Sequence, residues 1–259
     1  MTRDEQAPRA ASGTGPRALG AGWLVLPTYQ EIENIEPALR AVHAALTSCD
    51  LPGFRILVVD DSSPDGTAER ARALSAELPQ VEVLVRPQRQ GLGRAYVHGF
   101  TYAVAHGADV LLQMDADFSH DPADIPRLVA AVRAGADMAI GSRYTPGGGV
   151  ANWGLPRRLL SRGGSVYARL VLGLDVADLT GGFKCFRAAV LQAIEPETIE
   201  AQGYAFQIEV TNRAVRAGFR VVEVPIVFRD REHGQSKMNA RIAAEALLLV
   251  PRLRRKARG

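Results

Sequence analysis

Short apolar runs alternate with helix-length amphipathic segments over the first 140 residues of this chain. The runs predict strands at 23–27, 55–60, 81–85, 110–114 and 137–140, and the segments between them predict helices at 32–46, 67–78, 93–106 and 125–134. Strands that alternate with helices form βαβ units with right-handed crossovers around a parallel sheet. Helices cover both faces of such a sheet, which explains why the runs are almost continuously apolar. The predicted fold class is therefore α/β, a Rossmann-like domain with a mostly parallel central sheet flanked by helices.

The regular alternation ends after residue 141. The remaining segments predict a basic amphipathic helix at 157–172, an irregular glycine-containing stretch at 179–187, a helix at 206–217, a strand at 220–228, a polar loop at 229–240 and a helix at 241–249. Pro225 favours a sheet edge for the last strand, because proline lacks the N–H that a central strand needs. We expect the final helix to end at Pro251, before a basic tail.

The length of 259 residues suits one large domain, which we place at 21–240. Residues 1–20 are polar and rich in Pro, Gly and Ala, and they lack the apolar segment of a secretory signal. They predict a disordered leader. No stretch reaches the 18 or more apolar residues expected of a spanning helix. Residues 241–259 predict an amphipathic basic segment at the carboxyl end.

The formal net charge of +3 is unevenly distributed along the chain. Residues 213–259 carry 12 Lys and Arg against 4 Asp and Glu, whereas residues 1–212 carry 19 against 24. A basic end on a mildly acidic body suggests an anionic partner, either a membrane or a nucleic acid. Cys49 and Cys185 are far apart and lack metal-ligand spacing, which favours a reducing intracellular compartment. The histidines form no zinc motif.

The run Gln-Met-Asp-Ala-Asp-Phe-Ser-His at 113–120 is the strongest chemical feature. Alternate residues of a strand point the same way, so Asp115 and Asp117 should lie together at the carboxyl end of a strand. Open α/β sheets bind ligands at this edge. Two close carboxylates repel unless a cation or proton lies between them, and Mg²⁺ commonly binds one or two carboxylates plus substrate phosphates. A metal-assisted nucleotide-diphosphate site is one interpretation, and a solvated turn before Asp121 is the other.

Two polar motifs follow the first two predicted strands. In Pro-Thr-Tyr-Gln-Glu at 27–31, an aromatic beside a carboxylate suits a nucleotide base. The same residues also fit a helix start with Thr28 as cap and Glu31 at the third helical position. In Asp-Asp-Ser-Ser-Pro-Asp-Gly-Thr at 60–67, a turn and an N-cap explain the later residues. They leave two carboxylates, Asp60 and Asp61, unpaired at the strand end, where they could bind ribose or base.

Two further motifs are open to more than one interpretation. Gly-Leu-Gly at 91–93 opens a helix and suits either an anion or a simple turn, and it lacks the third glycine of a dinucleotide fingerprint. Arg-Glu-His-Gly-Gln-Ser-Lys at 231–237 could fold over a diphosphate or remain a solvated basic loop.

Taken together, these motifs resemble the inverting family 2 glycosyltransferases of A-type fold, specifically the polyprenyl (dolichyl) phosphate β-mannosyltransferases. The resemblance runs from about residue 23 to residue 237. It rests on the motifs at 27–31, 60–67, 91–93, 115–120, Gly-Ser-Arg-Tyr at 141–144, Leu-Thr-Gly-Gly-Phe at 179–183, Gly-Tyr-Ala-Phe-Gln-Ile-Glu at 203–209 and Gly-Gln-Ser-Lys at 234–237.

The resemblance implies a role for each matching residue. It implies that the guanosine of GDP-mannose is held by Pro27, Tyr29, Glu31, Val59 and Asp61. The sugar and diphosphate would lie along Asp115, Ala116 and Asp117, with Mg²⁺ or Mn²⁺ at Asp117 and the side chain of Ser119. The catalytic residues implied are Asp117, Arg143, Arg231 and Lys237, of which the three cations would bind phosphates. The implied acceptor residues are Arg157, Ser161, Thr180, Gly181 and Gln207.

Two positions depart from the family pattern. Gln30 stands where asparagine is usual, beside a contact residue. Ser119 stands where some members have glutamine, and its shorter side chain makes it a less secure metal ligand than Asp117. The implied reaction needs no strong general base, because the acceptor phosphate is already anionic. Its oxygen attacks the anomeric carbon while GDP leaves from the opposite face, which inverts α to β.

A polyprenol is buried in lipid, so the resemblance implies a cytoplasmic protein peripherally associated with the membrane. The apolar face at 247–249 and the basic tail suit anionic lipid, and a separate membrane-anchored partner protein is the alternative. Within the class, a UDP-glucose:polyprenyl-phosphate glucosyltransferase is the rival interpretation. A non-catalytic nucleotide- or nucleic-acid-binding protein is a more distant one, and no interleaved aromatic and basic stripe supports nucleic acid as a partner.

Overall fold

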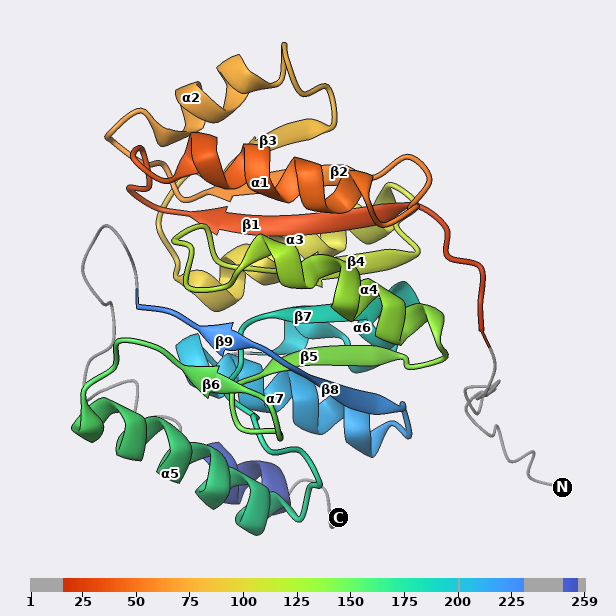
Figure 1. The fold of residues 1–259 in the computed structure, drawn as a ribbon, viewed down its shortest axis with the longest axis vertical. Coiled ribbons are helices and arrows are strands. Elements are labelled where there is room, and N and C mark those ends of the chain that lie inside the picture. The colour runs from red at the N-terminus through yellow and green to blue at the C-terminus, as the bar shows by residue number, and fades with distance from the viewer. Residues whose placement is uncertain (1–15, 200, 231–248, 256–259) are drawn as a thin grey trace, which may run out of the picture.

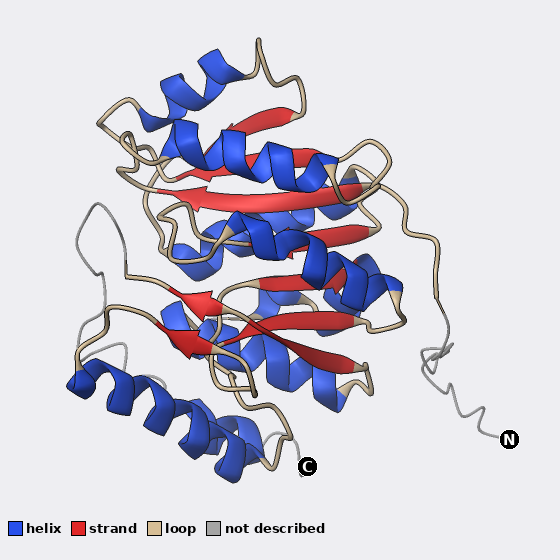
Figure 2. Ribbon diagram, in the orientation of Figure 1, coloured by secondary structure: helices blue, strands red, loops and turns tan. Residues whose placement is uncertain are grey.

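The computed structural model describes residues 16–199, 201–230 and 249–255. A seven-stranded sheet runs through the middle of the domain in the order β3-β2-β1-β4-β7-β5-β8 (Figures 1 and 2). Its strands are β1 (Gly22–Thr28), β2 (Arg55–Asp60), β3 (Val81–Val85), β4 (Val110–Gln113), β5 (Met138–Ser142), β7 (Lys184–Arg187) and β8 (Val221–Pro225). All neighbours pair in parallel except β7, which is antiparallel to both β4 and β5. The predicted mostly parallel α/β sheet is confirmed.

Helices cover both faces of the sheet (Figure 2). They are α1 (Ile35–Thr47), α2 (Thr67–Leu74), α3 (Leu92–Ala105), α4 (Ile125–Arg133), α5 (Leu155–Leu172), α6 (Ala188–Ile194) and α7 (Gly203–Arg216), with 3-10 turns at Pro122–Asp124 and Pro196–Thr198. Buried side chains of α1, α2 and α4 form one core with the sheet, and those of α3, α6 and α7 form the other. None of the helices formed by described residues is both long and apolar enough to cross a bilayer.

Alternation along each strand divides the apolar residues between the two cores. Leu24 of β1 packs toward α1, whereas its neighbour Val25 packs toward α3. All seven residues of β1 are buried, as expected for a strand covered on both faces. Gly99 of α3 permits close helix–sheet packing, because a Cβ there would lie only 2.4 Å from Val25 Cγ1.

The carboxyl ends of the parallel strands meet at one edge of the sheet, at the left of Figure 1. A small second sheet, β6 (Gly149–Val150) paired in parallel with β9 (Val227–Phe228), lies at the same edge. Helix α5 lies beyond this small sheet. The loops that follow β1, β2, β4 and β5 therefore all lie at this edge.

Several element predictions need correction. The stretch 179–187 was expected to be irregular, but its second half forms β7 in the centre of the sheet. Helix α6, which immediately follows, was not predicted. The edge position of the strand containing Pro225 is confirmed, although a separate strand β9 follows it.

Both predicted chain ends also differ from the structure. The leader was placed at 1–20, of which 1–15 lie outside the described residues; Arg17 N donates to Arg133 O at 2.8 Å and Leu19 is buried in the core. The boundary at residue 20 is therefore too late. The last helix was expected to end at Pro251, but residues 249–255 are helical through that proline. Val250 and Leu253 are buried in the core, so this part of the segment packs against the domain.

Candidate active site

Asp115 and Asp117 follow β4 at the ligand-binding edge of the sheet. Tyr96 Oη of α3 donates a hydrogen bond of 2.7 Å to Asp115 Oδ1. The Tyr96 side chain is fully buried, and its pKa is raised by that burial and by the negative charges of Asp115 and Asp117. The phenol therefore remains a hydrogen-bond donor at neutral pH. The Tyr96 hydroxyl thus holds the Asp115 carboxylate in place, and the charges of both Asp115 and Asp117 act on it.

The loop after Asp117 has an unusual backbone conformation. Phe118 adopts φ +57°, in the left-handed region that non-glycine residues rarely occupy. This turn lets Ser119 N donate to Asp117 Oδ1 at 3.1 Å, while Ser119 O accepts from Arg229 N at 3.1 Å. Backbone strain of this kind persists only where surrounding contacts enforce it, and it is frequent at functional sites.

The donor atoms in this loop suit a hard divalent cation. Asp117 and Ser119 are buried and offer oxygen ligands, which Mg²⁺ and Mn²⁺ accept. The described residues contain no cluster of three or more His, Cys, Asp or Glu side chains placed to hold a metal. That pattern is compatible with Mg²⁺ bound through one or two carboxylates plus substrate phosphates.

The loop that follows β1 is tied to the loop that follows β2. Gln30, also at positive φ, donates from its backbone N to Ser63 Oγ at 2.9 Å, and Glu31 N donates to Thr67 Oγ1 at 3.0 Å. The Tyr29 ring lies under the Arg89 guanidinium, 4.0 Å from ring centroid to Cζ. The predicted cap at Thr28 is wrong. Helix α1 begins at Ile35, and Thr28 Oγ1 donates instead to Asp60 Oδ2 at 2.8 Å.

Asp60 and Asp61 were expected to be unpaired, and both have partners. Asp60 accepts from Thr28 and from the backbone N and hydroxyl of Ser63, so it organises the predicted turn. Asp61 forms a buried ion pair with Arg86, at 2.7 Å from Nη1 to Oδ1. Pro27 and Val59 are directly opposite each other in β1 and β2. The predicted donor residues therefore converge at the ends of these strands, together with Arg86, which sequence analysis missed.

The glycines at 91–93 serve backbone geometry and packing. Gly91 precedes α3 at φ +92°. A Cβ at Gly93 would lie 3.0 Å from Ala201 O and 3.2 Å from the Phe206 ring, so this glycine allows α3 to pack closely against the start of α7. These contacts explain the motif without an anion.

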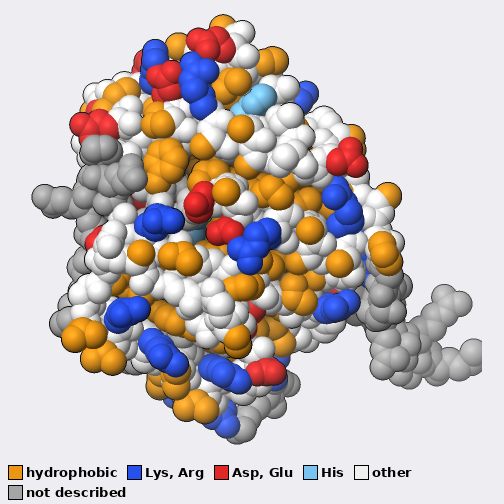
Figure 3. Space-filling view, viewed as in Figure 1, with side chains coloured by type: hydrophobic (Ala, Val, Ile, Leu, Met, Phe, Trp, Pro, Cys, Tyr) orange, Lys and Arg blue, Asp and Glu red, His pale blue; other side chains and the backbone are white. Residues whose placement is uncertain are grey.

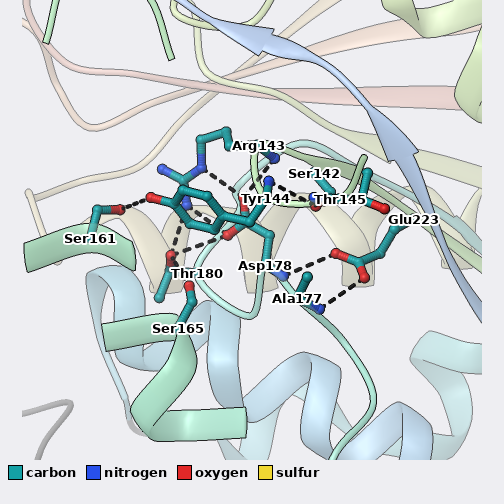
Figure 4. A network of polar contacts seen from close by, with 10 residues as sticks. All are labelled: Ser142, Arg143, Tyr144, Thr145, Ser161, Ser165, Ala177, Asp178, Thr180 and Glu223. Carbon is teal, nitrogen blue, oxygen red and sulfur yellow. Dashed lines mark hydrogen bonds and ion pairs between the residues drawn. The ribbon is translucent and has the colours of Figure 1, made fainter. Parts of the chain in front are cut away.

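Arg143 follows β5 and is buried against Asp178 (Figure 4). Its Nε and Nη2 donate to the two Asp178 oxygens, each at 2.7 Å, and its Nη2 donates to Thr180 Oγ1 at 2.7 Å. Burial alone would lower the pKa of Arg143, but the ion pair with Asp178 outweighs it and raises that pKa. Burial likewise would raise the pKa of Asp178, and Arg143 lowers it. Both groups remain charged.

This network extends to the segment that carries the predicted acceptor residues (Figure 4). The backbone N–H groups of Ala177 and Asp178 donate to Glu223 of β8 at 2.8 and 2.9 Å. Gly181 lies beside Asp178, because a Cβ there would be 3.4 Å from Asp178 Cγ. Thr180 and Gly181 are therefore held against Arg143. Nothing in the sequence pattern marked Asp178 as the partner of an arginine 35 residues earlier.

The other predicted acceptor residues lie on α5 and α7. Ser161 of α5 accepts from Tyr144 Oη at 2.7 Å, and Arg157 pairs with Asp230 at 2.8 Å with its guanidinium over Trp153. A cavity of about 400 Å³ lies between α5 and the loop after β5. Its lining comprises Arg143, Tyr144, Gly148, Gly149, Val150, Leu155, Arg158, Leu159 and Arg162. Sequence analysis did not single out Arg158 or Arg162.

Gln207 of α7 lies beside Gly182, close to Asp115. Lys184 of β7 donates to its side-chain oxygen. Burial lowers the pKa of Lys184 to about 7, an effect that Asp178 opposes and Arg143 reinforces. Burial also lowers the pKa of the nearby His120 to about 4, so its imidazole is neutral at pH 7. Predicted residues Arg231 and Lys237 lie outside the described residues.

The site thus places carboxylates after β4 opposite a buried arginine after β5, at the ligand edge of an α/β sheet. The chain matches the sequence model of Glycosyl transferase family 2 over residues 23–195. It belongs to this family, and the predicted family and fold are confirmed.

Individual proteins of known name indicate which members of the family this chain is similar to in sequence. The chain is 47% identical over 228 residues to undecaprenyl-phosphate mannosyltransferase of Micrococcus luteus, covering 88% of this chain and 91% of that protein. It is 46% identical to polyprenol monophosphomannose synthase of Mycolicibacterium smegmatis, covering 88% and 84%. Its structure is similar to glucosyl-3-phosphoglycerate synthase of Mycobacterium tuberculosis solved with Mn²⁺, uridine diphosphate and phosphoglyceric acid (TM-score 0.66, 19% identity, 90% and 78% covered). This last likeness concerns the fold alone.

Proposed function

We propose that this protein transfers mannose from GDP-mannose to a polyprenyl phosphate, giving polyprenyl β-D-mannosyl phosphate and GDP. Relatives that share nearly half of its residues are named for mannosyl transfer to such lipids. The observation that carries the proposal is the arrangement of Asp115 and Asp117 across the sheet edge from Arg143 and α5. One side suits a sugar diphosphate, and the other suits a phosphate attached to an apolar chain.

In this proposal an anionic oxygen of the acceptor phosphate attacks the anomeric carbon, and the bond to GDP breaks on the opposite face. Asp117 and Ser119 would hold Mg²⁺ or Mn²⁺, which supplies positive charge to the leaving diphosphate. Tyr96 fixes Asp115 beside the sugar. The ion pair with Asp178 holds the Arg143 guanidinium on the acceptor side of the site. Because Arg143 is paired with Asp178, it does not pair with Asp115 or Asp117.

On the donor side, we propose that the guanosine is bound by the residues at the ends of β1 and β2. Tyr29 and Arg89 already stack on each other, which supplies a flat surface beside the strand ends. Pro27 and Val59 are paired at the adjacent strand ends, and Asp61 is held there by Arg86. Glu31, whose loop is tied to the next one, completes the group.

The donor and the metal are tested by one transfer assay. We expect label from GDP-mannose to enter a short polyprenyl phosphate in detergent with Mg²⁺ or Mn²⁺, and we expect EDTA to reduce transfer by at least about 10²-fold, as for loss of a major electrostatic stabiliser. UDP-glucose serves as the parallel donor. Labelling from UDP-glucose alone would replace the donor assignment and keep the inverting chemistry. EDTA-resistant labelling would contradict the metal assignment.

We also propose that α5 contacts the membrane surface. Five of its apolar side chains are exposed, with relative exposures of 71% for Leu155, 72% for Leu159, 56% for Leu160, 46% for Val166 and 73% for Leu170. We call these residues the α5 patch. Apolar and basic side chains lie together over this helix at the lower left of the molecule (Figure 3). Apolar residues among arginines suit an anionic lipid surface next to the acceptor cavity.

The membrane proposal predicts a loss of lipid binding when the α5 patch is made polar. The double substitution Leu159→Gln and Leu170→Gln keeps helix propensity and is expected to weaken binding to anionic vesicles by at least about tenfold, since each leucine buried in lipid contributes 1.5 kcal/mol or more, roughly. Co-sedimentation measures the binding. The control Val85→Thr removes an exposed apolar side chain from β3, the opposite edge strand. Equal binding by the double variant and the control would contradict this role for α5.

A further inference from the structure

Lys184 is a buried cation at the centre of the sheet. It lies on β7, directly across from Gln113 of β4 and Ile140 of β5, and its side chain has 0% relative exposure. The reaction proposed above does not use it. Lysine is rarely fully buried unless its ammonium group is satisfied by hydrogen bonds or charge. The identity of its acceptors therefore indicates why it is there.

Among the described residues, the Lys184 amine is bound by one residue of α7. Lys184 Nζ donates to Gln207 Oε1 at 2.5 Å and to the backbone oxygen of the same residue at 3.1 Å. Lys184 Nζ lies against two oxygens of Gln207, so the amide presents its oxygen, and not its nitrogen, to Lys184. The contact therefore fixes which way the amide points, and its NH₂ group is directed away from Lys184.

The environment of Gly182 locates that NH₂ group. A Cβ placed on Gly182 would lie 3.7 Å from Gln207 Nε2, 3.8 Å from Asp115 Oδ2 and 3.6 Å from His120 Cε1. The amide nitrogen, the carboxylate and the neutral imidazole thus surround one short backbone segment. This segment adjoins Thr180 and Gly181, which are held against Arg143.

We propose that Lys184 is a positioning residue that orients the Gln207 amide, so that its N–H groups donate to a phosphate oxygen of the acceptor. The proposal rests on the proposed function and on the acceptor role that the family resemblance implies for Gln207. In its protonated form, Lys184 places a positive charge beside the amide oxygen, which polarises the amide and strengthens its N–H donors. A lysine presented directly to the cleft would instead pair with Asp115, whereas the amide carries no net charge. The buried cation thus acts on the phosphate through a neutral group.

A double-mutant cycle tests this coupling. Lys184→Met and Gln207→Leu are each expected to lower kcat/KM for the polyprenyl phosphate by about 10- to 100-fold, the effect of one hydrogen bond to a charged group. The double variant should be no worse than Gln207→Leu alone, because Lys184 acts only through that amide. The Kd for GDP should remain within about twofold of the wild-type value. Losses that multiply in the double variant, or unchanged acceptor kinetics in Lys184→Met, would overturn the proposal.

Gln207→Glu covers the case in which Lys184→Met does not fold. It gives Lys184 a carboxylate partner and removes the N–H donors, so we expect a Tm at least equal to that of the wild type and a loss of acceptor kcat/KM as large as in Gln207→Leu. Wild-type acceptor kinetics in this variant would refute the proposal. Wild-type transfer is measured first with GDP-mannose and UDP-glucose. Failure with GDP-mannose counts against the donor assignment, whereas the ratios among variants, taken with the active donor, test Lys184.

Discussion

Asp117→Asn is expected to lower mannosyl transfer by at least about 10²- to 10³-fold with little change in Tm. The substitution preserves the shape of the side chain, and an amide oxygen can still accept from Ser119 N, as Asp117 Oδ1 does at 3.1 Å. It removes the negative charge that a divalent cation requires, and loss of one electrostatic stabiliser of a transition state costs about this much in turnover. Radiolabel transfer measures the activity. Calorimetric titration of the protein with Mn²⁺ in the presence of GDP measures metal binding.

Asp121→Asn provides the matched control in the same loop. Asp121 caps the following 3-10 turn through Ala123 N at 3.0 Å, and asparagine caps as well as aspartate. We therefore expect near-wild-type transfer from this variant, although it loses the same charge four residues away. Near-normal transfer by Asp117→Asn, or an equal loss in both variants, would contradict the assignment of the metal to Asp117.

Asp178→Ala is expected to lower the free energy of unfolding by about 3–5 kcal/mol, the usual cost of removing one partner from a buried ion pair. The Arg143 side chain is 3% exposed and would remain charged without its carboxylate partner, with only Thr180 and nearby aromatic rings beside it. The backbone N–H of Arg143, which donates to Asp178 Oδ2 at 3.0 Å, would lose its acceptor as well. Urea denaturation at neutral pH measures the change.

Two further variants separate stability from activity. Asp175→Ala removes an aspartate three residues earlier that is 96% exposed and pairs with Arg169, and we expect a change below about 1 kcal/mol. The double variant Arg143→Leu with Asp178→Leu removes both charges and should recover much of the stability lost in Asp178→Ala. It should remain inactive in transfer because the acceptor side has lost its arginine. Recovery of activity along with stability would show that Arg143 serves the fold alone.

The sequence predicts strands β1, β2, β3 and β4 well, because each is a short, mainly apolar run followed by a helix. It fails at β7 for a specific physical reason. This strand contains Lys184, which is fully buried, and it follows two glycines, so neither apolar continuity nor strict alternation marks it. A charged residue is tolerated at this position because Gln207 of α7 accepts a hydrogen bond from Lys184. Such a partner is not visible in a local pattern.

The same limit applies to the site. Asp115 and Asp117 could be located because their strand is predictable and strand ends carry ligands. The residue that donates to Asp115, Tyr96, could not be located in this way, because it lies on α3, 19 residues earlier in the chain. Asp60 and Asp61 were wrongly expected to be unpaired, because Thr28 and Arg86, which pair with them, lie 32 and 25 residues away. Asp178 was likewise not recognised, because it lies 35 residues from Arg143.

The reversed strand β7 also constrains when the cleft can form during synthesis. Strands β4 and β5 are joined in the sheet only through β7, in which Arg187 pairs with Val110 and Phe186 pairs with Met138. The carboxylate-bearing half and the arginine-bearing half therefore cannot be linked by sheet hydrogen bonds until residues 184–187 have been made. Pairings so distant along the chain form slowly, because the intervening chain must first lose its freedom. A ribosome that stalls before this point holds a chain with both sets of charges and no cleft between them.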